Sequence, residues 1–414
     1  MKEGMIKPKK GNLFNDFVKH FSTGQYESMK TAGLDMLEGR RKGSYIYDEK
    51  GARYIDCVSG AATFNLGRRH PEITGALQQA IRETDQGNFV LLSQEKARLA
   101  KRLTEFVPGD FRGVYFSVAR GEAMDFACKL ARGCTGRPGL VTVDGGYYGE
   151  TGFAMSISER SDSACFGTLM PDVRRIPYGN FALAKEAIGK DTAAVIVEPV
   201  QAENHCRTAF RDYYRELRRL CDRAGAQLVF DETQTGMGRT GKKFAYEYYG
   251  MEPDILVIGE SLAAGVFPIT ATVYKKKLLK LLNEHPLIHL STFGGHDVGC
   301  RVAMKALEVY ERTRPWENAL LMSEMLKSGL LDIRAQHPEL IRSVAGMGLL
   351  LSLGLPTPDH AAAFCRAARN NGVLVTAGIV APYSVVIRPP LTISTIDVKA
   401  VISALAASAR KVRV

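Results

Sequence analysis

Acidic and amide side chains follow directly after a short apolar segment near the middle of the chain. The segment AQLVF ends at Phe230, and Asp231, Glu232 and Gln234 come next, within the run FDETQTGMGRTG. A carboxylate at the buried end of a strand is costly unless a cation or several hydrogen-bond donors meet it. Such a group could therefore bind a cationic part of a ligand. It could also have a structural role, by capping a neighbouring helix or by pairing with Arg239.

Four further segments share the apolar character of AQLVF. GVYFSV, GLVTV, AAVIVEPV and DILVIGE are short, rich in β-branched residues and separated by helical stretches. This pattern is typical of a mostly parallel sheet whose two faces are covered by helices. Ligands of such sheets bind at the carboxyl ends of the strands. We therefore expect the chemistry to lie just after the ends of these segments, at Val118, Val143, Val197, Phe230 and Ile258.

The two ends of the chain have a different pattern. Residues 14–50 read as polar and helix-like, and a turn at 48–51 joins two alternating runs that read as strands. Residues 71–106 show the apolar spacing of helices. Near the carboxyl end, VAGMGLLLSLGL, GVLVTAG and SVVIRPPL read as strands between helices, and VISALAASARKV reads as an amphipathic helix. We predict a small α/β unit there, packed beside the N-terminal segment.

The composition indicates an ordinary globular protein. Of the 414 residues, 45% are hydrophobic and 24% are charged, the usual balance of a water-soluble chain. The net charge of +11 is spread over short basic runs without interleaved aromatics, which argues against nucleic acid and for a solvated surface or an anionic small ligand. No apolar run reaches the roughly 18 residues of a membrane span. The N-terminus has no secretory signal, so we expect a cytoplasmic protein without a membrane partner.

The eight cysteines lie scattered along the chain, without a CxxC pair or a Cys/His cluster. In a long chain without a secretory signal, this distribution indicates reduced thiols. We therefore expect neither a disulfide framework nor a metal site.

Several motifs resemble the class III aminotransferases, which use pyridoxal 5′-phosphate (PLP). The run FDETQTGMGRTG, with AAVIVEPVQ before it and EPDIL after it, is similar to the central motif of that family. YIDCVSG with NLGRRHP resembles the entry segment, STFGG with GCRVAMKALEVYE the loop and helix that reach the dimer partner, and IRPPLT the C-terminal arginine motif. The order and spacing hold from about residue 40 to the end, and the ornithine and acetylornithine aminotransferases are the similar branch.

The resemblance implies the PLP-dependent transferase fold of type I. A large domain would carry a mostly parallel seven-stranded sheet, and a small α/β domain would form from both termini. We expect residues 1–70 to be an N-terminal segment that contributes to the small domain, 71–325 to be the large domain and 326–414 to be the C-terminal small domain. The active site would lie at a homodimer interface.

The resemblance also implies which residues meet the cofactor. They are Arg120, Gly121, Tyr147, Asp231, Gln234 and Thr292. Asp231 would face the pyridine nitrogen and Tyr147 would stack on the ring, while Gln234 would contact the ring hydroxyl. Thr292 of the partner subunit would donate to the phosphate.

Three residues would contact the substrate by the same resemblance. Arg388 would hold a substrate carboxylate through a two-pronged hydrogen bond. Glu203 stands where ornithine aminotransferases place a glutamate that can pair with that arginine. Tyr148 lies beside the stacking aromatic, at a position where the family pattern has a histidine.

The sequence departs from the family pattern at two important places. The pattern Asp-Ile-Leu-x-x-Gly-Lys ends on the reactive lysine, whereas here Gly259 is followed by Glu260. A carboxylate cannot form a Schiff base. In the phosphate-binding turn, Arg120 stands at a glycine position, in VARGEA instead of Asn-Ser-Gly-Thr/Ser-Glu-Ala. We therefore expect no PLP, or PLP or pyridoxamine phosphate (PMP) bound non-covalently.

Four interpretations follow. The leading one is a biosynthetic enzyme that uses the pocket on a small amino-acid-like or carboxylate substrate without PLP Schiff-base chemistry, with Glu260 as general acid or base. The second is a lysine-free enzyme that binds PLP or PMP non-covalently. The third is a non-catalytic subunit whose site is sealed by a salt bridge between Arg120 and Glu260. The fourth is an ordinary class III aminotransferase represented by a modified chain.

Overall fold

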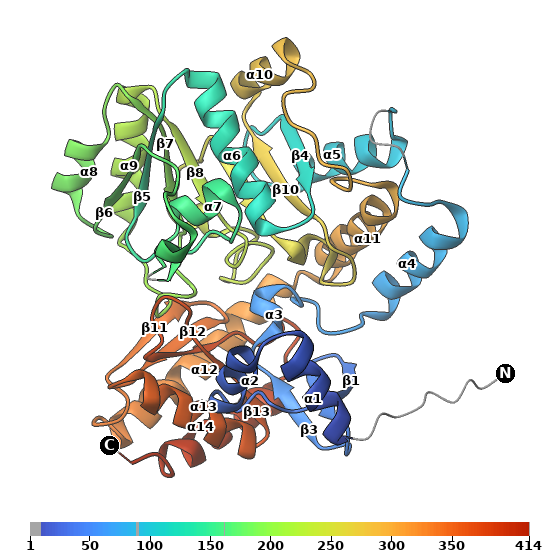
Figure 1. Cartoon of the computed structure of the whole chain (residues 1–414), viewed down its shortest axis with the longest axis vertical. Coiled ribbons are helices and arrows are strands. Elements are labelled where there is room, and N and C mark those ends of the chain that lie inside the picture. Colours follow the sequence, from blue (N-terminus) through green and yellow to red (C-terminus); the bar gives the residue numbers. More distant parts are fainter. Residues whose placement is uncertain (1–9, 88–90, 161, 414) are drawn as a thin grey trace.

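The computed structural model describes residues 10–87, 91–160 and 162–413 (Figure 1). Its centre is a seven-stranded sheet with the strand order β4-β10-β9-β8-β7-β5-β6. The strands are β4 (Gly113–Ser117), β5 (Gly139–Val143), β6 (Val173–Ile176), β7 (Thr192–Val197), β8 (Gln227–Asp231), β9 (Ile255–Ile258) and β10 (Thr270–Tyr274). Only β10 runs antiparallel to its neighbours. The predicted fold class, with its mostly parallel seven-stranded sheet, is confirmed.

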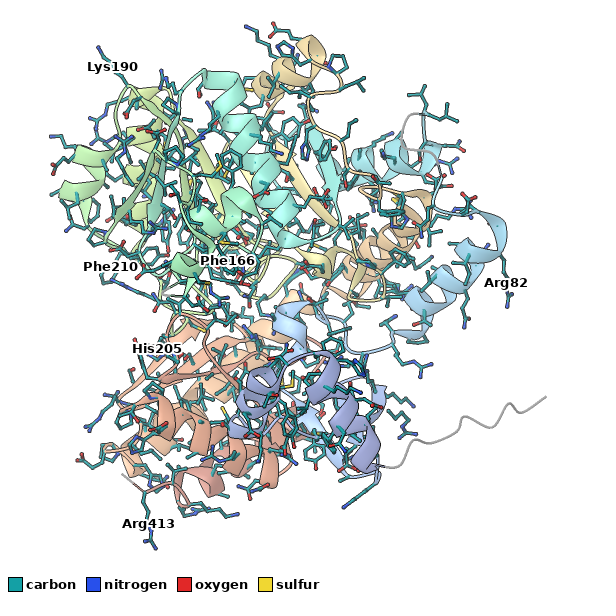
Figure 2. The ribbon with its side chains drawn as sticks, in the orientation of Figure 1. Arg82, Phe166, Lys190, His205, Phe210 and Arg413 are labelled. Atoms are coloured by element: carbon teal, nitrogen blue, oxygen red, sulfur yellow. The ribbon has the colours of Figure 1, made fainter. Side chains whose placement is uncertain are left out.

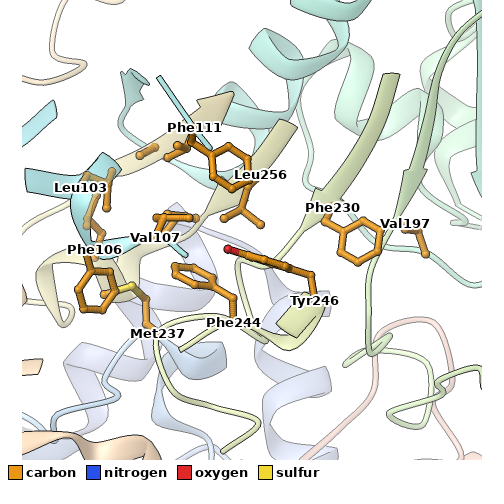
Figure 3. Close-up of a cluster of buried hydrophobic side chains, with 14 of the residues drawn as sticks. Leu103, Phe106, Val107, Phe111, Val197, Phe230, Met237, Phe244, Tyr246 and Leu256 are labelled. Atoms are coloured by element: carbon orange, nitrogen blue, oxygen red, sulfur yellow. The ribbon is translucent and has the colours of Figure 1, made fainter. Parts of the chain in front are cut away.

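Both faces of this sheet are buried, because successive strand residues alternate between two hydrophobic cores. Val229 belongs to one core and Phe230 to the other. Figure 3 shows part of the second core, where Phe230 and Leu256 from neighbouring strands lie beside Phe244 and Tyr246. This two-sided burial explains why the strands read as continuous apolar segments in the sequence.

Helices cover the two faces of the sheet. On one side, α6 (Arg120–Thr135) packs against β9 and β10, and on the other side α9 (Arg211–Ala224) packs against β7 and β8. The remaining helices of this large unit are α4 (Pro71–Glu83), α5 (Gln94–Phe106), α7 (Gly152–Ile157), α8 (Phe181–Ala187), α10 (Leu279–Glu284) and α11 (Asp297–Thr313). Short 3₁₀ turns are η1 (Ser163–Phe166), η2 (Ala245–Tyr248), η3 (Glu260–Ala263) and η4 (Lys276–Leu278).

A smaller unit combines both ends of the chain, as Figure 1 shows. It holds two four-stranded sheets, ordered β1-β2-β3-β13 and β11-β12-β15-β14. Their strands are β1 (Glu38–Lys42), β2 (Tyr45–Asp48), β3 (Arg53–Asp56), β11 (Ser343–Met347), β12 (Leu350–Gly354), β13 (Val373–Leu374), β14 (Thr376–Ala377) and β15 (Ser384–Ile387). The helices are α1 (Lys10–His20), α2 (Thr23–Thr31), α3 (Ser59–Ala62), α12 (Pro315–Gln336), α13 (Pro358–Asn370) and α14 (Thr395–Ala409).

Parallel pairing of β3 with β13 joins the N-terminal segment to the C-terminal one. The backbone turns at Arg314, which has a φ of 45° between α11 and α12, and α12 then packs on α14. The domain bounds at residues 70 and 325 stay a prediction. The helix-like interpretation of residues 14–50 was wrong for β1, which begins at Glu38. The two strands predicted on either side of the turn at 48–51 are β2 and β3, which pair antiparallel.

His205 lies at the junction of the two units (Figure 2). Its Nδ1 is 2.9 Å from Ser352 Oγ, and its Nε2 is 2.7 Å from Ser343 Oγ. The loop after β7 is thereby fixed against β11 and β12. In the part of the chain that the structure describes, no helix has both the length and the apolar character that crossing a membrane requires.

Candidate functional site

A cavity of about 570 Å³ lies between the two units, next to the carboxyl ends of the central strands. Both units contribute to its wall. Six of the residues predicted from the sequence line it, namely Arg120, Tyr147, Glu203, Gln234, Glu260 and Arg388.

The sheet topology brings the polar residues of this site together. Arg120 begins α6 just after β4, Asp231 ends β8, and Glu260 begins η3 after β9. Tyr147 comes from the loop after β5, and Glu198 follows β7 directly. All five residues follow strand ends at which the sequence predicted chemistry.

The guanidinium of Arg120 lies between two carboxylates. Its Nε and Nη2 donate to the same oxygen of Asp231, at 2.9 and 2.7 Å. Nη2 also lies 2.6 Å from Glu198 Oε1. The guanidinium carbon is 5.2 Å from the centre of the Tyr147 ring, within the range of a cation–π contact. The Arg120 side chain is 11% exposed, so water screens these contacts little.

Burial and charge act in opposite directions on the groups around Arg120. Burial lowers the pKa of the Arg120 guanidinium, but the charges of Asp231 and Glu198 outweigh it and the pKa is raised, so the group stays cationic. Burial raises the pKa of Glu198 to about 8, with Arg120 opposing the rise and Asp231 adding to it. One cation thus faces one carboxylate and a second carboxyl that tends to hold a proton.

Glu260 contacts the backbone of Arg120 and not its side chain. The Arg120 backbone N–H donates to Glu260 Oε1 at 3.0 Å, at the N-terminus of α6, where a negative charge is favourable. The salt bridge between the two side chains that the sealed-site interpretation required is therefore absent from the described contacts. The Arg120 guanidinium points instead to Asp231 and Glu198, which are both buried.

A second polar network joins the small unit to the large one across the cavity. Arg388 Nη1 donates to Glu203 Oε1 at 2.7 Å and to Gln234 Oε1 at 2.8 Å. Gln234 Nε2 donates to Glu203 Oε1 at 3.1 Å. Burial raises the pKa of Glu203, but Arg388 and the other hydrogen bonds outweigh burial, and the pKa is lowered. Glu203 is therefore ionised and paired with Arg388, as the resemblance implied.

Four predicted site residues do not line the cavity, namely Asp231, Tyr148, Gly121 and Thr292. Tyr148, expected to bind substrate, is fully buried in the core, where its hydroxyl accepts from Thr142 at 3.1 Å and donates to the Ile196 carbonyl at 3.3 Å. That expectation is corrected, because adjacent residues point to opposite sides of this loop. Gly121 is buried beneath the Thr151 side chain. Thr292 is exposed on the surface.

The sequence suggested that Arg239 could pair with Asp231, but its side chain binds other groups. Arg239 is buried and donates to Asn65 Oδ1 at 2.5 Å and to the Leu349 carbonyl at 2.9 Å, so it does not serve Asp231. Glu232 accepts hydrogen bonds from the backbone N–H groups of Ala245 and Tyr246. Of the two adjacent carboxylates, only Asp231 faces the site.

Sequence reasoning missed several polar residues of the site, among them Glu198, Thr233 and Thr376. Glu198 directly follows Val197, one of the strand ends that the sequence singled out, so the strand-end rule alone could have found it. Thr233 and Thr376 line the cavity, and their Oγ1 atoms are buried without a hydrogen-bond partner among the described residues. Only the folded structure reveals an unpartnered hydroxyl.

A strained turn forms another part of the wall. The residues Ser59, Gly60, Ala61 and Ala62 have φ angles of 47°, 56°, 57° and 67°. Gly60 and Ala61 line the cavity. Non-glycine residues in this left-handed region carry a steric cost, which is commonly stored at functional sites. Among the described residues, no group of three or more His, Cys, Asp and Glu side chains could hold a metal ion.

Known proteins resemble this chain over most of its length. The profile of the family described as Aminotransferase class-III matches residues 28–408. An uncharacterized aminotransferase of Archaeoglobus fulgidus is 37% identical over 365 residues, which cover 88% of this chain and 86% of the relative. A putrescine aminotransferase of Pectobacterium atrosepticum is 33% identical over 384 residues, which cover 89% and 82%.

The fold is also that of solved aminotransferases. An ornithine aminotransferase of Toxoplasma gondii, in a structure with PLP at partial occupancy of its active site, matches with a TM-score of 0.85 and 23% identity. The match covers 98% of this chain and 99% of that one. At this identity the likeness establishes the shared fold alone. Because the family profile and both sequence relatives cover most of the chain, this protein belongs to the class III aminotransferases.

Proposed function

We propose that this member of the class III aminotransferases acts on a small amino-acid-like or carboxylate-bearing substrate without Schiff-base chemistry on PLP. The observation that carries the proposal is the Glu260 carboxylate at the end of β9, where the family pattern places its reactive lysine. Among the described residues that line the cavity, none is a lysine. A carboxylate can move a proton, but it cannot bond covalently to an aldehyde carbon as an amine does.

The side chains around the cavity do not fit PLP in the way its family binds it. PLP, where it is bound, supplies an electron sink whose pyridine nitrogen needs a carboxylate partner. Asp231, the expected partner, already accepts two hydrogen bonds from Arg120. Arg120 also lies near the Tyr147 ring, on which the pyridine would stack. We therefore derive no step through the cofactor.

Glu260 is suited to carry a proton. The Arg120 backbone N–H holds one of its oxygens at 3.0 Å, which fixes the carboxylate at the cavity wall. From there it can accept a proton from a bound substrate and return it in a later step, which is general acid–base catalysis. Fixed geometry favours this role, because a proton carrier must stay within hydrogen-bond reach of the reacting group.

The opposite wall has the groups to hold the substrate. Arg388 would bind a carboxylate, and Glu203, displaced from Arg388, would accept a hydrogen bond from an ammonium group. The unpartnered hydroxyls of Thr233 and Thr376 offer further hydrogen bonds inside the cavity. These complementary charges support a zwitterionic substrate of amino-acid size.

We also propose that the protein works as a homodimer in the cytoplasm. The exposed position of Thr292 is compatible with a loop that reaches a partner subunit. Light scattering of the purified protein would test this assembly, and a monomer at micromolar concentration would contradict it.

The test of function begins with a screen of amino acids, amines and oxo acids by mass spectrometry, with and without added PLP. Glu260→Gln should then lower kcat by at least about a hundredfold, the usual contribution of a general acid or base, with little change in substrate affinity. Glu186→Gln, on the exposed side of α8, is the matched control and should retain activity. Full turnover by Glu260→Gln would refute the proposed role, and PLP-dependent amino transfer by the wild type would favour an ordinary transaminase.

A further inference from the structure

We propose that the guanidinium of Arg120 is a built-in replacement for the pyridine ring of PLP. It would fill the ring position beside Tyr147 and Asp231 and keep the site assembled without a cofactor. The inference goes beyond the proposed function, because Glu260 could carry protons whether or not the ring position is filled.

The contacts of Arg120 match those that a protonated pyridine ring would need. Such a ring is planar and cationic, and it presents one N–H to a carboxylate. The guanidinium is also planar and cationic, and it presents two N–H groups to Asp231, at 2.9 and 2.7 Å. Its carbon lies 5.2 Å from the centre of the Tyr147 ring, the aromatic expected to stack on the cofactor. One side chain thus occupies both expected contacts of the ring.

The topology shows how Arg120 reaches this position. Arg120 follows β4, whereas its partners Asp231 and Glu198 lie at the ends of β8 and β7, with β10 and β9 in between. The side chain therefore extends along the strand ends beneath the cavity. Glu260, at the end of the intervening β9, holds the Arg120 backbone N–H at 3.0 Å.

This arrangement couples the two departures from the family pattern. Glu260 fixes the backbone from which the Arg120 side chain extends, and Arg120 neutralises the carboxylates that lie beyond Glu260. The side chains of Asp231 and Glu198 are 0% and 2% exposed. A carboxylate as deeply buried as Asp231 needs a cation, which a bound cofactor would bring and which Arg120 supplies permanently. Because this cation is part of the chain, its occupancy of the site does not depend on the concentration of a free ligand.

The experiment compares the wild type with Arg120→Gly in titrations with PMP, followed by calorimetry and by the absorbance of PMP. The wild type should show no saturable binding at millimolar PMP. Arg120→Gly should bind PMP at least about a hundredfold more tightly, because the vacated carboxylates regain a cation. Arg219→Gly, which removes an exposed arginine from α9, should behave like the wild type.

Guanidinium chloride at a few millimolar provides a second readout. It should raise the Tm of Arg120→Gly and leave the Tm of the wild type unchanged, whereas an equal concentration of sodium chloride should raise neither. Equal stabilisation of both proteins by guanidinium would contradict a vacated guanidinium site.

The wild-type titration tests the inference even if Arg120→Gly does not fold. Saturable, PMP-specific binding to the wild type would overturn the inference, because the ring position would then be open. That outcome would leave the proposed role of Glu260 intact, since that role is judged by the turnover of Glu260→Gln.

Discussion

Arg120 and Asp231 are 111 residues apart in the chain, yet two nitrogens of the arginine lie within 2.9 Å of one carboxylate oxygen of the aspartate. The Asp231 side chain is 0% exposed, so this contact lies in the interior of the protein. The pair connects the end of β8 to the start of α6. It is therefore a structural link across the sheet at the candidate site.

Removing the charge of Arg120 should destabilise the protein strongly. Arg120→Met keeps most of the side-chain volume but leaves the buried Asp231 carboxylate without its cation. Loss of one member of a buried ion pair costs about 3–5 kcal/mol of unfolding free energy. Urea denaturation at neutral pH measures this loss. Arg219→Met, at an exposed pair with Glu216, is the control and should change stability far less. Similar losses in both variants would mean that the buried contacts of Arg120 add little.

The pH dependence of stability should reveal the protonated state of Glu198. Burial raises the pKa of Glu198 to about 8 from the usual 4.5, so the folded protein keeps a proton that the unfolded chain loses in this range. Stability should therefore fall as the pH rises from about 4.5 to 8. Glu198→Gln cannot lose a proton and should flatten this decline. Urea denaturation at a series of pH values measures the difference, with Glu186→Gln as the control. If the unfolding free energies of the wild type and Glu198→Gln changed in parallel with pH, the raised pKa of Glu198 would be disproved.

The sequence allowed the large sheet to be predicted because its strands are buried on both faces. β5, β7, β8 and β9 are therefore continuous apolar runs. β1 was missed because its five residues are polar and exposed, and only pairing with β2 makes it a strand. Local sequence gives no sign of such a pairing.

The residues of the candidate site could be predicted in part, but their contacts could not. The strand ends indicated where the chemistry should lie, and the family resemblance then singled out Arg120, Asp231 and Glu260 at these ends. The partners of Arg120 depend on where a long side chain extends in three dimensions. That direction follows from the burial of Glu198 and Asp231, which only the folded structure provides. Tyr148 was misplaced for the same reason, since its neighbour Tyr147 faces the cavity.

The left-handed turn beside the cavity should be relieved by glycine. Ala61 has a φ of 57°, where an L-residue with a Cβ is strained by roughly 1–2 kcal/mol. Glycine removes this strain but loses more entropy on folding, so Ala61→Gly should raise the unfolding free energy by about 1 kcal/mol or less. Ala182→Gly, at an exposed site in α8, should instead lower it, because glycine is a poor helix former. A lower unfolding free energy for Ala61→Gly than for the wild type would contradict the expected strain at Ala61.

The unpartnered hydroxyl of Thr233 should cost stability in the ligand-free protein. Its Oγ1 is buried at the cavity without a hydrogen-bond partner among the described residues. Valine has the same shape without the polar atom, and an unsatisfied buried group costs about 1–3 kcal/mol. Thr233→Val should therefore raise the unfolding free energy by up to that amount, measured by urea denaturation.

Thr272→Val provides the matched comparison for Thr233→Val. Thr272 is also a buried threonine, but its Oγ1 donates to the Ala123 carbonyl at 3.0 Å. The same substitution there should lower the unfolding free energy by about 1 kcal/mol, because it removes a satisfied hydrogen bond. Opposite signs at the two sites would identify Thr233 as a residue kept for its ligand at the expense of stability. A loss at both sites would show that the Thr233 hydroxyl already has a partner, and it would remove this residue from the proposed substrate contacts.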